Sequence, residues 1–136
     1  MKKNAAVDIA CSLWRFINET NWQEAHKLLS DDFKADWPQS REKIIGPDNF
    51  IDLNRTYPGT HQIQILNHQH SYDNCDKLDQ VVTQVHIKSQ MPEGKNLDLF
   101  GISFFTIRDM KIFEAVEYWA DSYPAPEWRK KLVTYY

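Results

Sequence analysis

The sequence LDLFGISFFTIRDMKIFEAVEYWAD, residues 97–121, decides the fold. Its first part, Leu97 to Ile107, is a long apolar run typical of a buried strand, and Gly101 within it predicts a bulge or bend. Residues 108–111 (RDMK) predict a turn, and Ile112 to Asp121 predicts the last strand. The stretch therefore predicts a hairpin of two long antiparallel strands.

The residues before this hairpin have the same period of two, which indicates further strands. Ile63 and Ile65 alternate with glutamines, and residues 81–87 alternate between two sets of side chains. Between them and the final hairpin, residues 91–94 (MPEG) supply the Pro and Gly of a tight turn. We therefore predict an antiparallel meander of four strands.

The first half of the chain has helical periodicity instead. The predicted helices are residues 4–19, 22–29 and 46–55, and a short strand is predicted at 33–37. Asn4 and Asn21 are suitable N-caps, Pro47 is compatible with a first helical turn, and Pro38 stops the strand. Helices first and strands last predict an α+β fold, in which a curved, cone-shaped antiparallel sheet wraps around N-terminal helices and leaves a pocket.

Composition narrows the functional classes. The chain of 136 residues is 42% hydrophobic and 26% charged, which predicts one globular domain over residues 1–136. A net charge of −3 argues against a nucleic-acid partner. No apolar run is long enough for a membrane helix, and Asp8 interrupts the segment that a signal peptide would need, so we expect no membrane association and a cytoplasmic location. Cys11 and Cys75 are expected to be free thiols.

Three stretches together carry a family resemblance: residues 28–33 (LLSDDF), 104–112 (FFTIRDMKI) and 117–121 (EYWAD). Their order and spacing resemble the nuclear transport factor 2-like superfamily over nearly the whole chain. Residues 37–40, 54–59, 118–121 and 124–129 are similar to small bacterial SnoaL-like proteins. The resemblance implies the cone fold and its pocket. It does not imply one reaction, because the fold hosts isomerases, cyclases, epoxide hydrolases, dehydratases and binding modules.

The sequence departs from one branch of this superfamily. In ketosteroid isomerases the general base is an acid immediately before a proline that follows the second helix. Here that position is Trp37, before Pro38, and the acid Asp36 lies one residue earlier. One residue along a strand moves a side chain to the opposite face, so an isomerase of that type is not expected.

Three carboxylates are candidate catalytic groups: Asp121, Glu117 and Asp36. The resemblance to SnoaL-like cyclases puts Asp121 or Glu117 in the role of general acid/base. A carboxyl group in an aromatic pocket has a raised pKa, which suits it to proton transfer near neutral pH. The alternative is structural, with Glu117 paired to a basic side chain and Asp121 at the end of its strand.

The candidate ligand-binding residues are Trp14, Trp37, Tyr57, His86, Ser103 and Trp119. Trp37 would be a stacking wall for a flat ligand or part of the core, and Trp14 is expected to face the sheet as core. Tyr57 would bind a ligand or anchor the turn after the third helix. Ser103 would line the pocket without acting as a nucleophile, since no His and Asp accompany it in a triad order.

The histidines are a weaker signal. His68 and His70 lie two apart on a strand, and His86 on a neighbouring strand would be needed to complete a metal site. We expect a polar surface there, and neither a metal nor an organic cofactor. His86 alone would be a proton carrier in the pocket or a paired surface residue.

The leading functional hypothesis is binding of a small, mostly apolar or aromatic molecule, with carboxylate acid/base catalysis of the isomerase, cyclase or hydrolase type. The rivals are a non-catalytic binding or dimerisation module and a subunit of a larger oxygenase. Strands 81–87 and 97–107 carry apolar residues on both faces. Together with the resemblance, this predicts a homodimer that pairs sheet to sheet.

Overall fold

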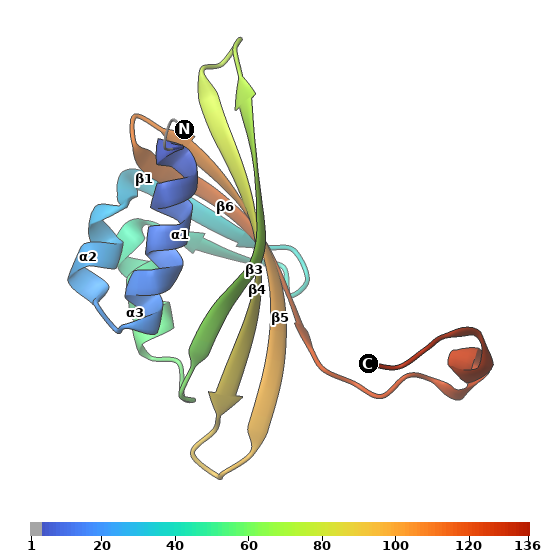
Figure 1. Cartoon of the computed structure of the whole chain (residues 1–136). Coiled ribbons are helices and arrows are strands. Elements are labelled where there is room, and N and C mark those ends of the chain that lie inside the picture. The colour runs from blue at the N-terminus through green and yellow to red at the C-terminus, as the bar shows by residue number, and fades with distance from the viewer. Residues whose placement is uncertain (1–3) are drawn as a thin grey trace.

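The helices occupy one face of a single sheet, as the computed structural model shows for residues 4–136 (Figure 1). The elements are α1 (Ala5–Asn18), α2 (Trp22–Lys27), β1 (Leu29–Trp37), β2 (Glu42–Ile45), α3 (Pro47–Arg55), β3 (Gln62–Asp73), β4 (Leu78–Gln90), β5 (Asn96–Arg108), β6 (Lys111–Asp121) and the 3₁₀-helix η1 (Glu127–Leu132). The expected α+β architecture is confirmed.

The helix starts follow from their caps. The Asn4 side chain accepts a hydrogen bond from Val7 N–H, and the Asn21 side chain does the same for Glu24 N–H. Pro47 opens α3, as its fixed φ and missing N–H allow. The apolar stripe of α1 is buried against the sheet, as its spacing predicted.

The sheet has six strands in the order β2-β1-β6-β5-β4-β3. Strands β3 to β6 form the predicted antiparallel meander, whereas β1 runs parallel to β6 and pairs with β2 on its other side. The inner face of the meander carries Val81, Val85, Phe105 and Ala115, which are buried under α1. This packing leaves the opposite, outer face of the sheet without helices (Figure 1).

The structure corrects several predicted boundaries. The second helix ends at Lys27 rather than Leu29, because Leu29 already pairs with Ile112 as the first residue of β1. The predicted strand at 33–37 therefore starts four residues earlier. Strand β2 was not predicted. Strand β3 runs from Gln62 to Asp73, so it contains Ile63 and Ile65 as well as His68 and His70, which were predicted to lie on a strand, and its register with β4 shifts between Ile65 and Asn67.

Gly101 does not mark the predicted bulge or bend. It pairs in regular register with Val85 and Trp119, and the register shift between β5 and β6 lies at Thr106 and Ile107. A Cβ at Gly101 would lie 2.3 Å from the Trp119 ring. The glycine is therefore explained by a close approach of an indole to the backbone.

The two residues of the turn between β5 and β6 have the left-handed backbone conformation. Asp109 and Met110 have φ values of 51° and 63°, which match a two-residue type I′ hairpin turn. After β6 the chain is extended and then forms η1. We call residues 122–136 the tail, and it projects away from the body on the helix-free side of the sheet (Figure 1).

Candidate functional site

A cavity of about 730 Å³ lies between α1, α3 and the inner face of the sheet. Its wall is largely apolar and aromatic, and its mouth is polar. The lining residues are Trp14, Ile17, Trp37, Gln39, Ser40, Glu42, Leu53, Asn54, Thr56, Tyr57, Pro58, His61, Ile63, Ile87, Leu99, Glu117 and Trp119. This volume is within the range of cavities that hold drug-sized molecules. None of these lining residues is a lysine or an arginine.

Two of the tryptophans pack at right angles at the inner end. The rings of Trp14 and Trp119 have centroids 6.0 Å apart and an interplanar angle of 82°. This edge-to-face arrangement is a favourable one for aromatic pairs. Trp14 Nε1 donates to Thr83 Oγ1 at 2.9 Å, whereas the buried Nε1 of Trp119 has no hydrogen-bond partner among residues 4–136. One indole N–H is therefore satisfied, and the other is buried without a hydrogen-bond partner in this part of the chain.

A row of polar side chains crosses the inner face of the sheet. Thr83 on β4 is opposite Ser103 on β5, and Ser103 is opposite Glu117 on β6. All three side chains are buried. Thr83 lies between the inward residues Val81 and Val85, Ser103 between Gly101 and Phe105, and Glu117 between Ala115 and Trp119, so the row interrupts the core.

Glu117 is the ionisable group of this row, with 1% of the residue exposed. Trp37 Nε1 donates to its Oε1 at 3.1 Å, and Ser103 Oγ is hydrogen-bonded to its Oε2. Burial raises the pKa of Glu117 above its ordinary value, and the two hydrogen bonds only partly oppose that effect. No basic side chain among residues 4–136 forms an ion pair with it.

Asp36 and Trp37 lie on opposite faces of β1, as their adjacent positions require. Trp37 points inward to Glu117, whereas Asp36 lies on the outer face with Lys43 Nζ 3.5 Å from its Oδ1. The expectation drawn from the ketosteroid isomerase pattern is met in its geometry: the position before Pro38 faces the cavity, and it holds an indole. The inner carboxyl comes instead from β6.

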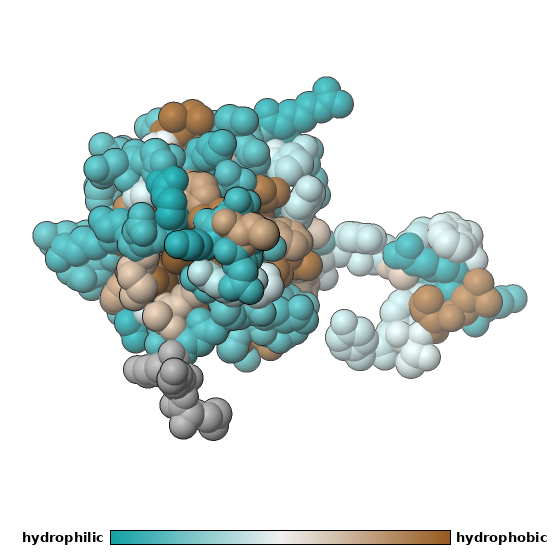
Figure 2. Space-filling model, turned by 90° about the horizontal axis from the view of Figure 1, so that it is seen from above, coloured by the Kyte–Doolittle hydropathy of each residue, from teal (hydrophilic) through white to brown (hydrophobic). Residues whose placement is uncertain are grey.

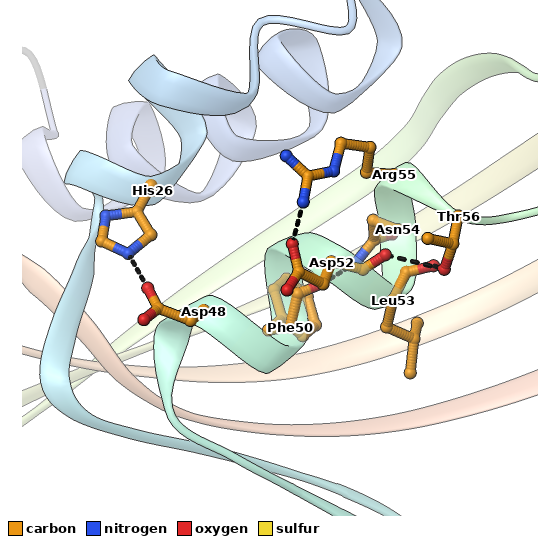
Figure 3. Close-up of polar contacts among 8 residues, drawn as sticks. All are labelled: His26, Asp48, Phe50, Asp52, Leu53, Asn54, Arg55 and Thr56. Atoms are coloured by element: carbon orange, nitrogen blue, oxygen red, sulfur yellow. Dashed lines mark hydrogen bonds and ion pairs between the residues drawn. The ribbon is translucent and has the colours of Figure 1, made fainter.

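Helix α3 and the residue after it contribute Leu53, Asn54 and Thr56 to the lining of the cavity. Figure 3 shows the polar contacts that hold this helix in place. Its first turn is tied to α2 by His26 Nε2 and Asp48 Oδ1, 2.7 Å apart. Asn54 Nδ2 donates to Phe50 O at 2.8 Å, and Thr56 Oγ1 donates to Asp52 O at 2.8 Å. These bonds fix two polar residues, Asn54 and Thr56, in the lining of the cavity.

Tyr57 and His61 complete the mouth. The hydroxyl of Tyr57 lies 2.9 Å from Ser89 Oγ, so the phenol is anchored to β4 as well as lining the cavity. His61 Nε2 lies 2.9 Å from the carbonyl oxygen of Ile17, which fixes Nε2 as the protonated nitrogen. Both side chains therefore hold α1 and the turn after α3 against the sheet.

The structure brings some of the sequence-derived candidates together and separates others. Five line the cavity: Trp14, Trp37, Tyr57, Glu117 and Trp119, with Ser103 directly behind Glu117. Asp36 is on the outer face. His86 is also there, stacked on Phe100 with ring centroids 4.7 Å apart and paired with Asp98 at 2.8 Å. Asp121 is exposed at the end of β6 and is not a lining residue.

Two residues that contribute to the site, Thr83 and Gln39, were not predicted from the sequence, although the pattern around Thr83 indicates its role. Thr83 breaks an inward apolar series between Val81 and Val85, which marks it as a polar position in the core. The side-chain oxygen of Gln39 accepts a hydrogen bond from the backbone N–H of Trp119 at 3.0 Å. Gln39 lies in the turn after β1, where no periodicity identifies a side chain's direction.

The histidines do not converge on a metal. His70 lies 2.9 Å from Asn4 Nδ2 and 2.7 Å from Asp79 Oδ1, and His86 is on the outer face. Among residues 4–136, no three His, Cys, Asp or Glu side chains form a metal-binding group. Likewise, no helix in this part of the chain combines the length and apolar character that crossing a membrane requires.

Comparison with known proteins identifies the architecture. No protein-family model and no curated protein matches the chain. Solved structures do match. An NTF-2-like protein of unknown function from Burkholderia xenovorans is 22% identical, with a TM-score of 0.73 over 97% of this chain and 95% of that one. A protein from Kribbella flavida, provisionally named a ketosteroid isomerase, is 22% identical, with a TM-score of 0.71 over 95% of this chain and 87% of that one.

The chain has the nuclear transport factor 2-like fold. The expected cone, with its N-terminal helices and curved sheet, is thereby confirmed. A third structure with this fold, from Mycobacterium tuberculosis, was solved in complex with estradiol-17β-hemisuccinate. It is 14% identical, with a TM-score of 0.71 over 87% of this chain and 95% of that one.

Proposed function

We propose that this protein binds a small, uncharged, largely apolar ring compound in the cavity, and that Glu117 exchanges a proton with it. The observation that carries the proposal is a buried carboxyl without a basic partner in the wall of a cavity of about 730 Å³. The steroid ester held by the Mycobacterium tuberculosis structure supports a ring ligand of this size.

The charge of the ligand follows from the lining. No lysine or arginine lines the cavity, and its inner end is formed by the rings of Trp14, Trp37 and Trp119. An anionic group moved there would lose its hydration without gaining a cation. Two groups remain for a neutral polar atom: the carboxyl of Glu117 and the unpartnered Nε1 of Trp119. A ketone, ester or epoxide oxygen satisfies such donors.

The proton step follows from the raised pKa of Glu117. A buried carboxyl whose pKa is raised keeps its proton to a higher pH than an ordinary carboxyl, and it can give that proton to a ligand oxygen. The carboxylate that results is stabilised by the N–H of Trp37 and by the hydroxyl of Ser103, which can donate as well as accept. Because Trp37 covers Oε1, the ligand must take the place of this N–H before proton transfer.

Binding is tested with three naphthalenes that share one ring system, followed by quenching of tryptophan fluorescence. We expect 2-acetylnaphthalene, a neutral acceptor, to bind about fivefold more tightly than 2-ethylnaphthalene, since one net hydrogen bond contributes about 1 kcal/mol. We expect 2-naphthoate to bind most weakly. Equal affinities for all three would contradict the proposed role of the lining.

The role of Glu117 is tested with two variants. Glu117→Leu should remove the preference for the acetyl compound over the ethyl compound, whereas Glu117→Gln should keep it because an amide can still donate. The affinity for 2-acetylnaphthalene should fall as pH rises through the pKa of Glu117 in the parent protein and stay constant in Glu117→Gln. If both proteins show the same pH profile, the protein is a binding module without a proton-transfer group.

We further propose that the protein forms a homodimer through the outer face of the sheet. Nine residues in three registered rows form what we call the outer patch: Val82, Phe104 and Val116; Gln84, Ile102 and Tyr118; His86, Phe100 and Ala120. Phe100, Ile102, Phe104 and Tyr118 are each 38–45% exposed. An apolar cluster of this kind typically marks an interface. Ile102→Arg should dissociate the dimer in sedimentation equilibrium without altering the cavity.

A further inference from the structure

We propose that the tail, residues 122–136, clasps the outer patch of a second copy of this chain, with Trp128 seated in a hollow on that patch. This inference rests on the proposed homodimer and adds a partner segment to it. The tail is the part of the molecule that is least covered by the chain itself. Figure 2 shows it as a separate lobe beside the body.

The tail exposes several large apolar side chains, whereas a segment without a binding partner is expected to expose polar ones. Tyr123, Trp128 and Leu132 are 70%, 76% and 80% exposed. The N–H of Ser122 donates to Asp98 O at 3.0 Å, but no hydrogen bond or ion pair among residues 4–136 joins residues 123–136 to the body. Exposed aromatic and aliphatic side chains on one short segment indicate a surface that is buried elsewhere.

A matching hollow lies on the outer face. It has a volume of about 510 Å³ and is lined by Gln39, Gln84, Phe100, Gly101, Ile102, Tyr118, Trp119 and Ala120. The hollow lies between the outward side chains of Phe100 and Ile102 on β5 and those of Tyr118 and Ala120 on β6. An indole ring is flat and apolar with one N–H donor, and Gln84 and Gln39 offer amide oxygens at the rim.

The charges of tail and body are complementary. The tail contains Arg129, Lys130 and Lys131 against the single acid Glu127, so its side chains carry +2. Since the whole chain carries −3, the remaining residues carry −5. Asp98 lies on β5 beside the last row of the outer patch, where it pairs with His86 and has Lys88 opposite it in register. The attraction of the basic tail to the body is therefore based on the opposite net charges of the two parts.

The tail is directed away from its own patch. It leaves β6 at Asp121 and contains Pro124 and Pro126, which lack N–H groups and favour extended backbone. Pro126 has φ −66° and ψ 151°, the polyproline II conformation. To reach its own hollow the tail would have to reverse within this stiff stretch. We therefore assign the tail to a second copy rather than to its own sheet.

The outer patch alone is small for a stable dimer. Three strands about 4.8 Å apart and five residues along each give a patch about 15 Å on a side, or roughly 200 Å² in plan. Specific interfaces bury about 800 Å² on each partner. Two exchanged tails, one from each copy, would supply much of the difference with the side chains that the single chain leaves exposed.

The test uses the full-length chain with substitutions at exposed positions. We compare Trp128→Ala/Leu132→Ser with Tyr72→Ala, which removes a half-exposed aromatic at the far end of β3. Sedimentation equilibrium gives the dimer dissociation constant, and 2-acetylnaphthalene binding reports the cavity independently. We expect the tail variant to weaken dimerisation at least about tenfold, or about 1.4 kcal/mol. The Tyr72→Ala and cavity measurements should be unchanged.

The position of the tail is tested by photo-crosslinking. Trp128→p-benzoylphenylalanine is prepared with and without ¹⁵N labelling, and the two are mixed before irradiation. We expect mass spectrometry to find crosslinks to the β5 and β6 peptides around Ile102 and Tyr118, in pairs that combine a labelled and an unlabelled chain. Crosslinks within one chain only would show that the tail folds back and would overturn the proposal.

The outcomes separate the tail from the proposals on which it rests. If Ile102→Arg abolishes the dimer while Trp128→Ala/Leu132→Ser leaves its dissociation constant unchanged, the sheet-to-sheet dimer stands and the tail proposal fails. If the parent chain is monomeric at every concentration, both fail, and naphthalene binding still decides the function of the cavity.

Discussion

The indole N–H of Trp37 and the carboxyl of Glu117, 80 residues apart in the chain, meet at 3.1 Å between Nε1 and Oε1. The bond joins β1 to β6 at the wall of the cavity. The indole N–H donates to a carboxyl whose charged form is disfavoured by burial. The pKa of Glu117 therefore depends on its hydrogen bond with Trp37.

Glu117 should make the stability of the protein depend on pH. Burial raises its pKa in the folded chain above the ordinary value of 4.5. Between these two values the folded chain keeps a proton that the unfolded chain has lost. The free energy of unfolding therefore falls as pH rises above about 4.5, by up to about 1.4 kcal/mol per pH unit, until the folded carboxyl also ionises.

Urea unfolding of Glu117→Gln across this pH range checks the effect. The amide keeps an acceptor for Trp37 and a donor for Ser103 but has no charge, so we expect it to gain on the parent protein steadily as pH rises. Asp121→Asn, at the exposed end of the same strand, is the control and should follow the parent. A constant difference between Glu117→Gln and the parent would mean that Glu117 is ionised throughout.

Trp37→Phe should raise the pKa of Glu117 further. The hydrogen bond from the indole is one of the two contacts that lower this pKa, and phenylalanine retains most of the ring without the donor. We also expect a loss of about 1 kcal/mol of unfolding free energy. The ¹³C chemical shift of the Glu117 carboxyl, followed by NMR titration, gives the pKa directly. Trp128→Phe, in the exposed tail, should leave the titration unchanged.

The fold was predictable where side-chain patterns repeat. The α1 stripe, the caps at Asn4 and Asn21, and the paired strands around residues 91–94 and 108–111 each follow from local chemistry. The boundary error at α2 has a different cause. Leu29 belongs to β1 and not to the helix because it pairs with Ile112, a partner far along the chain.

The candidate site was predictable only in part, for the same reason. Alternation along β6 separated Glu117 from its neighbours, but it could not show that Asp121 on the same face lies beyond the cavity. Asp36 and Trp37 were separated correctly by the alternation of β1. That Glu117 is covered by Trp37 rather than paired with a base depends on the approach of β1 to β6, which no local pattern contains.

Gly101→Ala should damage the protein through Trp119. The new Cβ would lie 2.3 Å from the indole ring, which is far inside van der Waals contact. We expect a loss of about 2 kcal/mol and a change in tryptophan fluorescence as the ring is displaced. Adding Trp119→Leu should restore part of the loss, because the smaller side chain leaves room for the methyl group. Additive losses in thermal unfolding would show that the two residues do not compete for space.

Thr83→Val should destabilise the chain although it hardly changes the shape of the core. Thr83 Oγ1 is the acceptor for Trp14 Nε1 at 2.9 Å, and both side chains are buried. Valine leaves that N–H unpaired, for which we expect a cost of about 2 kcal/mol in urea unfolding. Thr83→Ser, which keeps the hydroxyl, is the matched control. If valine and serine cost the same, packing rather than the hydrogen bond determines the choice of threonine.

Met110→Gly should stabilise the hairpin that sets Ser103 opposite Glu117. Met110 has φ 63° and is 64% exposed, so its side chain adds strain and little packing. Relief of the left-handed conformation is worth about 1–2 kcal/mol, and the greater freedom of glycine in the unfolded chain costs about 0.4–1 kcal/mol. We expect a net gain of about 0.5 kcal/mol in urea unfolding. Met110→Ala retains the Cβ and should show no gain. A loss of stability in Met110→Gly would mean that the methionine side chain holds the turn through contacts that outweigh its backbone strain.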